Sequence, residues 1–261
     1  MSTAQILNIT THRTAPMPRR PWLVNMSWRD LLFAHWRMEP AAVRARLPQP
    51  LDLGLYDGAA WVGVIPFVMD FAVRGVPMML ATPEINVRTY VSYRGVPGVY
   101  FFSLDLASVV GVLGARIGYG LPYWLAKMWA RRVALDGNGE KDGSGGKDDV
   151  GEQYEIRYGT ARVANRADFW GCYRPIGAVF QAAPGTIEHF VTEHYCLYNV
   201  ERGKVYHVPI HHLPWRLQPA EAEIVRNTMA DAVGIRLPQS APLLHFAREL
   251  EVLAWTPERV G

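Results

Sequence analysis

The chain has 261 residues, of which 49% are hydrophobic and 20% charged, a composition typical of a globular protein with a full core. The net charge of +3 is small and the arginines are scattered without a basic run, so no nucleic-acid partner is expected. The longest apolar run, residues 104–115, is interrupted by Asp105 and Ser108 and is too short to span a bilayer. Because no basic segment followed by an apolar core marks a secretory signal, we expect a cytoplasmic protein without a membrane partner.

The first residues predict an arm that leads into one large domain. Residues 1–24 carry three prolines and no clear period, which is typical of an irregular lead-in. Residues 25–261 are expected to form a single domain. The two cysteines, Cys172 and Cys196, are too few for a disulfide framework, and nothing requires them to pair.

Strands and one short helix are expected next in the chain. Residues 31–38 are typical of a strand that places His35 on one face. Pro40 suits the first turn of a short helix. Further strands are expected at 61–67 and 68–73.

The stretch that follows carries most of the functional signal. Residues 84–92 alternate strictly between polar and apolar, which predicts a strand, and residues 99–105 are bulky on both faces and should be covered on both. The two runs are close enough to form a hairpin. The polar face of the first run consists of Glu84, Asn86, Arg88 and Tyr90. Beside a buried strand this face looks inward, into a barrel lumen or cleft; the alternative is a solvated outer face with an ordinary Glu–Arg pair.

Helical character appears after the hairpin. Residues 106–118 predict a helix in which small residues recur every three or four positions, and this smooth stripe should lie close against a sheet. Residues 123–134 continue as an amphipathic segment. Residues 136–151 are rich in glycine, lysine and aspartate with almost nothing to bury, which predicts a mobile loop.

The remaining residues predict several strands and one helix. Residues 219–233 have apolar side chains on one side, a proline near the start and Gly234 as a stop, which is typical of a helix. The predicted strands are 152–163, 168–173, 193–200, 205–211 and 250–255. Many strands with few helices indicate an α+β, mainly β fold, built as a large antiparallel barrel or sandwich.

Several motifs resemble the YqjF-like family of the acetoacetate decarboxylase-like superfamily, from about Trp28 to Trp255. The motifs are His35-Trp36, Trp61 to Phe67, Pro83 to Val91, Gly98 to Asp105, Tyr119 to Tyr123, Thr192 to Tyr195 and His211 to Trp215. The resemblance implies an acetoacetate decarboxylase-like antiparallel β-barrel with a few packed helices.

The resemblance also bears on chemistry. The decarboxylases carry Gly-x-Pro-Lys-Lys, whose first lysine forms a Schiff base and needs a depressed pKa to be nucleophilic. The matching stretch here is Gly120-Leu121-Pro122-Tyr123-Trp124, so Tyr123 stands where that lysine would be. Lys127 lies one turn away if this segment is helical, and it could replace the missing amine.

Three residues are the catalytic candidates: Glu84, Arg88 and Tyr123. Glu84 matches a carboxylate that lines the decarboxylase pocket, which implies a general acid or base, although it could instead pair with Arg88 or Arg116. The predicted pocket-lining residues are His35, Asn86, Tyr90, Tyr100, Arg116, Lys127 and His211.

No metal or other cofactor is expected. His207 and His211 share a strand face but stand about 13 Å apart, too far to bind one ion. Two functions remain open: an enzyme acting on a small carbonyl- or carboxylate-bearing molecule without covalent catalysis, and a non-catalytic small-molecule binding protein. A homo-oligomer is left open.

Overall fold

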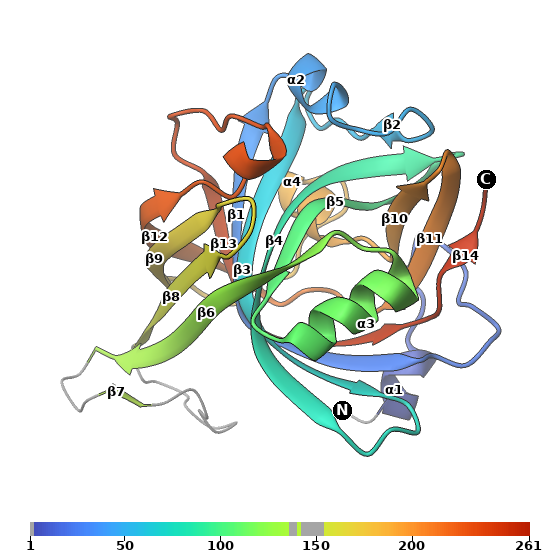
Figure 1. Ribbon diagram of the computed structural model, residues 1–261, viewed down its shortest axis with the longest axis horizontal. Helices are drawn as coiled ribbons and strands as arrows, with labels where there is room; N and C mark the ends of the chain where they lie inside the picture. Colours follow the sequence, from blue (N-terminus) through green and yellow to red (C-terminus); the bar gives the residue numbers. More distant parts are fainter. Residues whose placement is uncertain (1–2, 136–139, 142–153) are drawn as a thin grey trace.

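The computed structural model describes residues 3–135, 140–141 and 154–261 (Figure 1). The predicted mobile loop, 136–151, lies outside these residues except for Glu140–Lys141, which form the short strand β7. β7 pairs with residues 132 and 133.

The centre of the fold is a closed ring of paired strands. Its members are β1 (Val24–Met38), β3 (Ala60–Val73), β4 (Met79–Tyr93), β5 (Val96–Leu106), β10 (Cys196–Glu201), β11 (Lys204–His211) and β13 (Leu243–Ala254). Neighbours pair in this order, antiparallel except for β5 with β10, and β13 closes the ring by pairing with both β11 and β1. This arrangement confirms the prediction of a mainly β fold built on a large, closed antiparallel sheet.

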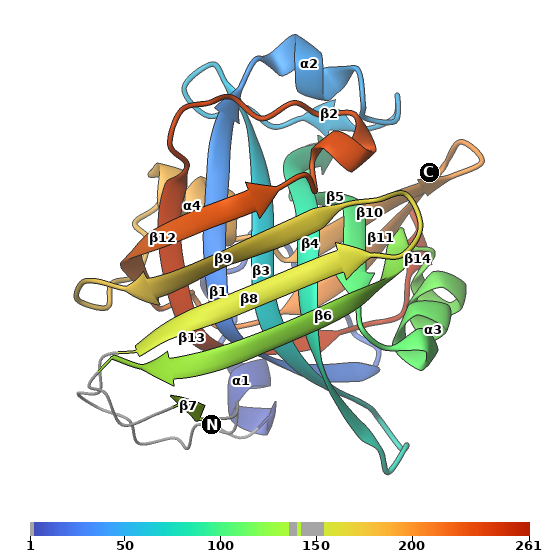
Figure 2. The same cartoon turned by 60° about the vertical axis from the view of Figure 1, so that its left-hand side comes forward.

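A second layer of strands crosses one side of the ring (Figure 2). It consists of β6 (Tyr123–Ala134), β8 (Tyr154–Arg162), β9 (Asp168–Pro175) and β12 (Leu217–Asn227). β6 joins the ring through β5, and β12 joins it through β13. The strands β1, β3 and β4 therefore lie between two hydrophobic cores, one inside the ring and one under the second layer.

Two segments with helical character in the sequence are strands, and the helix prediction for 219–233 is wrong. Strand β12 alternates in burial along its length, and only Asp231–Val233 form a 3-10 helix, η1, before Gly234. Residues 123–134 are strand β6, with Met128 and Ala130 against the second core. Pairing with neighbouring strands outweighs the helix propensity of residues such as Ala, Glu and Met, since that propensity differs by only about 0.7 kcal/mol per residue.

The hairpin predicted from the alternating run is confirmed. β4 and β5 pair antiparallel from Glu84–Leu106 to Tyr93–Val96. Arg94 and Gly95 connect the strands with φ of 51° and 79°, which is the left-handed pair of a tight hairpin turn. One irregularity in β5, opposite Val87 and Arg88, leaves the alternation of β4 intact.

The helices are few and short. They are α1 (Thr3–Asn8), α2 (Pro40–Arg44), α3 (Val109–Tyr119) and α4 (Ile187–Thr192), beside the short strands β2 (Asp52–Leu53) and β14 (Glu258–Arg259). The predicted helix near 106–118 is confirmed as α3, which begins after the cap Ser108 and ends at Gly120 with φ 63°. α3 and α4 each place side chains against the core inside the ring.

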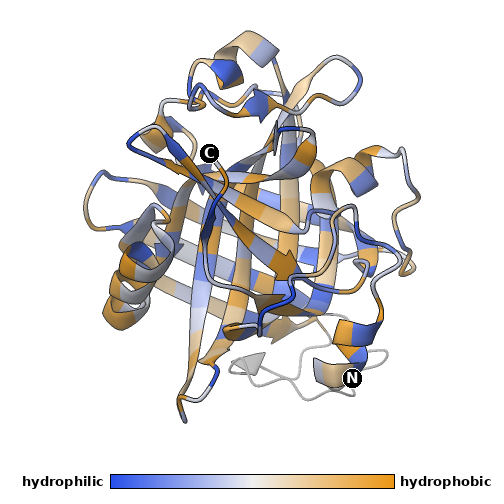
Figure 3. Cartoon of the chain, turned by 90° about the vertical axis from the view of Figure 1, so that its right-hand side faces the viewer, coloured by the Kyte–Doolittle hydropathy of each residue, from blue (hydrophilic) through white to orange (hydrophobic). Residues whose placement is uncertain are grey.

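The predicted packing of the small-residue stripe of α3 holds at the buried Gly111 and is wrong for Gly114 and Gly118. A side chain at Gly114 or Gly118 would meet no neighbouring atom, so these glycines face open space. The helix packs through Val112, Ala115 and Tyr119 instead. Its outward side exposes the apolar residues Val109, Val110, Leu113 and Ile117. Figure 3 colours much of this helix, at the left, as hydrophobic.

Candidate functional site

The polar face of β4 is buried inside the ring. Glu84, Asn86, Arg88 and Tyr90 are at most 7% exposed. Ile85 and Val87, on the opposite face of the strand, pack in the second core. The solvated alternative is therefore excluded for these side chains, and β4 carries polar and charged groups into the ring interior.

Glu84 and Tyr123 are brought together by the start of β6. The Tyr123 hydroxyl donates a hydrogen bond of 3.0 Å to Glu84 Oε2. Burial raises the pKa of Glu84 to about 8, and hydrogen bonds from Tyr123 and Asn86 oppose that rise. Burial, together with the adjacent Glu84, raises the pKa of Tyr123 well above its ordinary value. At neutral pH this pair is therefore a protonated carboxyl beside a neutral phenol.

Arg88 lies further along the same face. Its guanidinium lies over the rings of Phe33, at 5.3 Å, and Tyr90, at 5.7 Å. One NH₂ group donates to the Val191 carbonyl at 3.4 Å, whereas Nε is buried without a partner. Among the described residues, no carboxylate forms a salt bridge with Arg88. The pairing of Glu84 with Arg88 or Arg116, one of the alternatives for this carboxylate, is likewise not seen in the described part of the chain.

Two imidazoles extend the polar cluster beyond Arg88. His35 Nε2 lies 2.5 Å from the Tyr90 hydroxyl, and the Tyr90 ring stacks on His194 at 4.9 Å. Burial lowers the pKa of His35 well below its ordinary value and lowers that of His194 to about 3, so both rings are neutral. Their Nδ1 atoms are buried without partners. His194 was not among the predicted site residues, although it lies in the Thr-Glu-His-Tyr motif that signals the family.

Four of the predicted pocket-lining residues lie away from Glu84. Tyr100 is half-buried against the cluster around Leu51 and Tyr198. Arg116 is exposed, and its Nε donates a hydrogen bond of 2.6 Å to the backbone carbonyl of Tyr123. His211 is buried, but it contacts the N-terminal arm.

Lys127 is the fourth of these residues. It is exposed on β6. In a strand, its Cα lies about 13 Å from that of Tyr123 rather than one helical turn away.

A fully buried ionic pair was not among the predicted site residues. Arg162 binds Asp105 through two hydrogen bonds of 2.6 and 2.8 Å, and both side chains are fully buried. Asp105 pairs with Ile85 across the sheet, so it faces the second core, on the other side from Glu84. The sequence does contain a signal for this pair. Asp105 lies in a strand that is bulky on both faces, and a carboxylate buried in such a strand needs a charged partner.

Three further observations concern metal ligands, cysteine thiols and membrane-spanning helices. Within residues 3–135, 140–141 and 154–261, no three His, Cys, Asp or Glu side chains are placed to hold a metal ion. Cys172 and Cys196 are free thiols. None of the helices in the described part has the length and apolar character needed to cross a membrane.

The closed ring with helices over it defines an acetoacetate decarboxylase-like fold. The enduracididine biosynthesis enzyme MppR complexed with pyruvate shares it with a TM-score of 0.62 and 14% identity, over 95% of this chain and 93% of that chain. An acetoacetate decarboxylase-like enzyme from Sphingomonas wittichii RW1 has a TM-score of 0.62 and 10% identity, over 95% of this chain and 99% of that chain. Acetoacetate decarboxylase from Legionella pneumophila has a TM-score of 0.58 and 14% identity, over 100% of this chain and 96% of that chain. At these identities the similarity shows the fold alone.

The sequence comparisons define the family. The profile of DUF2071, described as an uncharacterized conserved protein, matches residues 25–251, and the chain belongs to this family. The uncharacterized protein YqjF of Bacillus subtilis is 42% identical over 244 residues, covering 92% of this chain and 93% of YqjF. The predicted YqjF-like membership and acetoacetate decarboxylase-like fold are both confirmed.

Proposed function

We propose that the protein binds a small carbonyl- or carboxylate-bearing molecule inside the ring, with Arg88 holding a carboxylate and Glu84 and Tyr123 facing a carbonyl oxygen. The observation that carries this proposal is the buried guanidinium of Arg88, which has no carboxylate partner among the described residues. A buried charge without a counter-ion costs several kcal/mol, roughly. A bound carboxylate would supply that counter-ion through charge-assisted hydrogen bonds.

Glu84 supports the second half of the proposal. With its pKa raised to about 8, it is mostly protonated at neutral pH and can donate a hydrogen bond to a carbonyl oxygen. Asn86 lies between Glu84 and Arg88 on the same face, and its Oδ1 atom is buried without a partner. Since Glu84 and Arg88 are four residues apart on a strand, about 13 Å between Cα atoms, a ligand that reaches both is extended.

The proposed chemistry is non-covalent. A phenol cannot form an imine, so Tyr123 cannot act as the Schiff-base lysine whose place it takes in the family resemblance. Lys127 and Lys204 are exposed on β6 and β11. Neither amine is buried inside the ring beside Glu84, where it would have to meet a bound ketone.

Calorimetric titration with 2-oxo and 3-oxo acids of increasing length tests this site. Pyruvate and acetoacetate are the shortest probes, chosen because the names of the structural neighbours include them, and longer acids that reach both Glu84 and Arg88 should bind more tightly. We expect binding that weakens at least tenfold, roughly, in Arg88→Met, as for a lost charge-assisted hydrogen bond. The exposed Arg216→Gln is the matched control. Equal affinity in Arg88→Met and the control would refute the site.

A non-catalytic binding protein is the second candidate, and the tyrosine at position 123 favours it. Turnover of the acids that bind, followed as carbon dioxide release, separates the two candidates. Borohydride trapping with acetoacetate should give no adduct on the wild-type chain, whereas Tyr123→Lys places an amine beside Glu84 and serves as the positive control. An adduct mapped to Lys127 in the wild type would restore covalent catalysis.

A further inference from the structure

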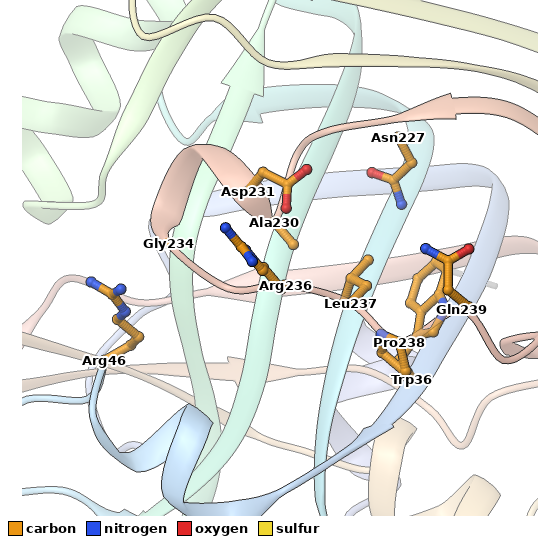
Figure 4. Close-up of a pocket in the computed structure, with 10 residues that line it drawn as sticks. All are labelled: Trp36, Arg46, Asn227, Ala230, Asp231, Gly234, Arg236, Leu237, Pro238 and Gln239. Atoms are coloured by element: carbon orange, nitrogen blue, oxygen red, sulfur yellow. The ribbon is translucent and has the colours of Figure 1, made fainter.

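A pocket of about 780 Å³ opens on the surface, away from the ring interior (Figure 4). Its walls come from the end of β1, from the turn after α2 and from the segment that follows β12. The polar lining residues are Arg46, Asn227, Asp231, Arg236 and Gln239. The volume lies within the range of about 300–1,000 Å³ that small-molecule sites occupy.

Two arginines with free donors border this pocket. Arg46 and Arg236 are both exposed, and neither forms a salt bridge or side-chain hydrogen bond within the part of the chain that the structure describes. Guanidinium groups bind phosphate and carboxylate through paired, charge-assisted hydrogen bonds. Asp231 is the one carboxylate among the lining residues, so the lining carries a net positive charge.

The backbone is shaped to seat one of these guanidiniums. A Cβ atom at Gly234 would lie 2.6 Å from Cζ of Arg46 and 2.7 Å from one of its NH₂ nitrogens. Gly234 also has φ 76°, a conformation that favours glycine. The Arg46 guanidinium therefore lies directly on the backbone at Gly234, in space that any other residue would fill.

A buried amide supplies a further unused donor. Asn227 Oδ1 accepts a hydrogen bond from the Met229 amide at 3.2 Å, which orients the side chain. Its Nδ2 atom is buried without a partner, and Figure 4 shows it directed toward Leu237 and Gln239. An unpaired buried donor destabilises the fold, and a ligand oxygen would supply the missing hydrogen bond.

We propose that this pocket binds a small molecule in which an anionic group, phosphate or carboxylate, is joined to an apolar ring. Arg46 and Arg236 hold the anion. The Asn227 amide donates to an oxygen or ring nitrogen of the ligand. Trp36, Leu237 and Pro238 form the apolar wall against its body. This site is separate from the proposed ring-interior site, and neither depends on the other.

Thermal-shift and calorimetric titrations with four probes test the site. Adenosine 5′-monophosphate and benzoate carry the two anions, and adenosine and benzamide are their neutral counterparts. Binding of either anion, without binding of its neutral counterpart, supports the proposal and identifies the preferred group. No binding of either anion to the wild-type protein overturns it.

Variants assign that binding to the pocket. Arg46→Gln with Arg236→Gln should weaken it at least tenfold, roughly, whereas Arg202→Gln with Arg216→Gln, two exposed arginines elsewhere, should leave it unchanged. Asp231→Asn should tighten binding about two- to fivefold by removing a repelling charge. Equal affinity in the two double variants overturns the assignment.

A glycine pair provides a test without a change of charge. Gly234→Ala should displace the Arg46 guanidinium and weaken anion binding. Gly185→Ala carries the same type of backbone strain, with φ 87°, but has no atom near the added Cβ. Anion affinity that is equal in these two variants would show that the seating of Arg46 plays no part.

Discussion

The Tyr123 hydroxyl and the Glu84 carboxyl form a hydrogen bond of 3.0 Å, with Tyr123 8% exposed and Glu84 3% exposed. This contact joins the polar face of β4 to the first residue of β6, 39 positions along the chain. Both groups are buried inside the ring, so water cannot solvate a charge on the carboxyl group. The pKa of Glu84, about 8 against an ordinary 4.5, is the direct consequence.

Glu84 should make stability fall as the pH rises. Between pH 4.5 and about 8 the native state keeps a proton that the unfolded chain has lost, so the free energy of unfolding decreases through this window. Glu84→Gln cannot ionise and should remove this contribution to the pH dependence. Its stability relative to wild type should therefore rise by a few kcal/mol, roughly, from pH 5 to pH 8. Urea unfolding at pH 5, 6.5 and 8 measures this; parallel profiles for the two proteins would contradict it.

The Asp105–Arg162 pair should be costly to break because both side chains are fully buried. Arg162→Met leaves an uncompensated carboxylate and should lower the free energy of unfolding by about 3–5 kcal/mol. Arg162→Met combined with Asp105→Leu should cost less than Arg162→Met alone. The exposed Arg174–Glu221 pair is the control, and Arg174→Met should cost below about 1 kcal/mol. Similar losses for the two pairs in urea unfolding would refute the role of burial.

Two glycines of the second layer should respond differently to alanine. A Cβ at Gly171 would lie 2.6 Å from the backbone oxygen of Glu223 on the paired strand β12, which cannot move without disturbing the sheet. A Cβ at Gly159 would meet the half-exposed Trp129 ring at 2.5 Å, and that side chain can rotate away. We expect a loss of about 1–3 kcal/mol for Gly171→Ala and a smaller one for Gly159→Ala. Thermal unfolding of both variants measures these losses, and a larger loss for Gly159→Ala than for Gly171→Ala would contradict the prediction.

The N-terminal arm should loosen in acid. His211 Nε2 lies 2.9 Å from the Ile6 carbonyl, and Nδ1 lies 2.9 Å from Arg13, an arrangement that suits the neutral ring. Burial lowers the pKa of His211 to about 4, with contributions from Arg13 and from the neighbouring His12 and His212. The unfolded or detached chain takes up the proton first, so this stabilisation is lost as the pH falls from 6.5 to 4.

Hydrogen exchange measures this release. Amides of residues 5–13 should lose protection at pH 5 relative to pH 7, after correction for intrinsic rates, while those of β4 should keep it. In His211→Gln the arm should exchange alike at both pH values. Undiminished protection of the wild-type arm at pH 5 would rule out His211 as its acid-sensitive contact.

The sequence by itself determined the elements whose information is local. The alternation from Glu84 to Ser92 repeats every two residues, and Arg94-Gly95 suits a tight turn, so the hairpin of β4 and β5 could be predicted without knowledge of its neighbours. Helix α3 likewise begins at Ser108 and ends at Gly120 because both caps lie within its own segment. The same alternation separated a polar from an apolar face, but only the burial of Glu84, Asn86, Arg88 and Tyr90 decided that the polar face is inward.

Only the tertiary structure decided which side chains meet inside the ring. Arg88 reaches Val191 across 103 positions, and His35 reaches Tyr90 across 55, because β13 closes the ring and α4 packs against its core. No local sequence pattern relates residues that lie so far apart along the chain. The family resemblance led to Glu84 and Tyr123, whereas His194 and Arg162 became visible only with their partners in place.

Tertiary contacts also decided that β6 and β12 are strands rather than helices. Their residues include good helix formers such as Ala, Glu, Lys and Met, and propensity alone favours helices there. In the fold, β12 pairs with β9 and β13, and β6 pairs with β8 and β5, so backbone groups are satisfied between strands. Alternate residues of both strands then pack against the second core. Propensity differences of a few tenths of a kcal/mol per residue are smaller than the burial gained in this way, roughly 0.8 kcal/mol for each CH₂ group.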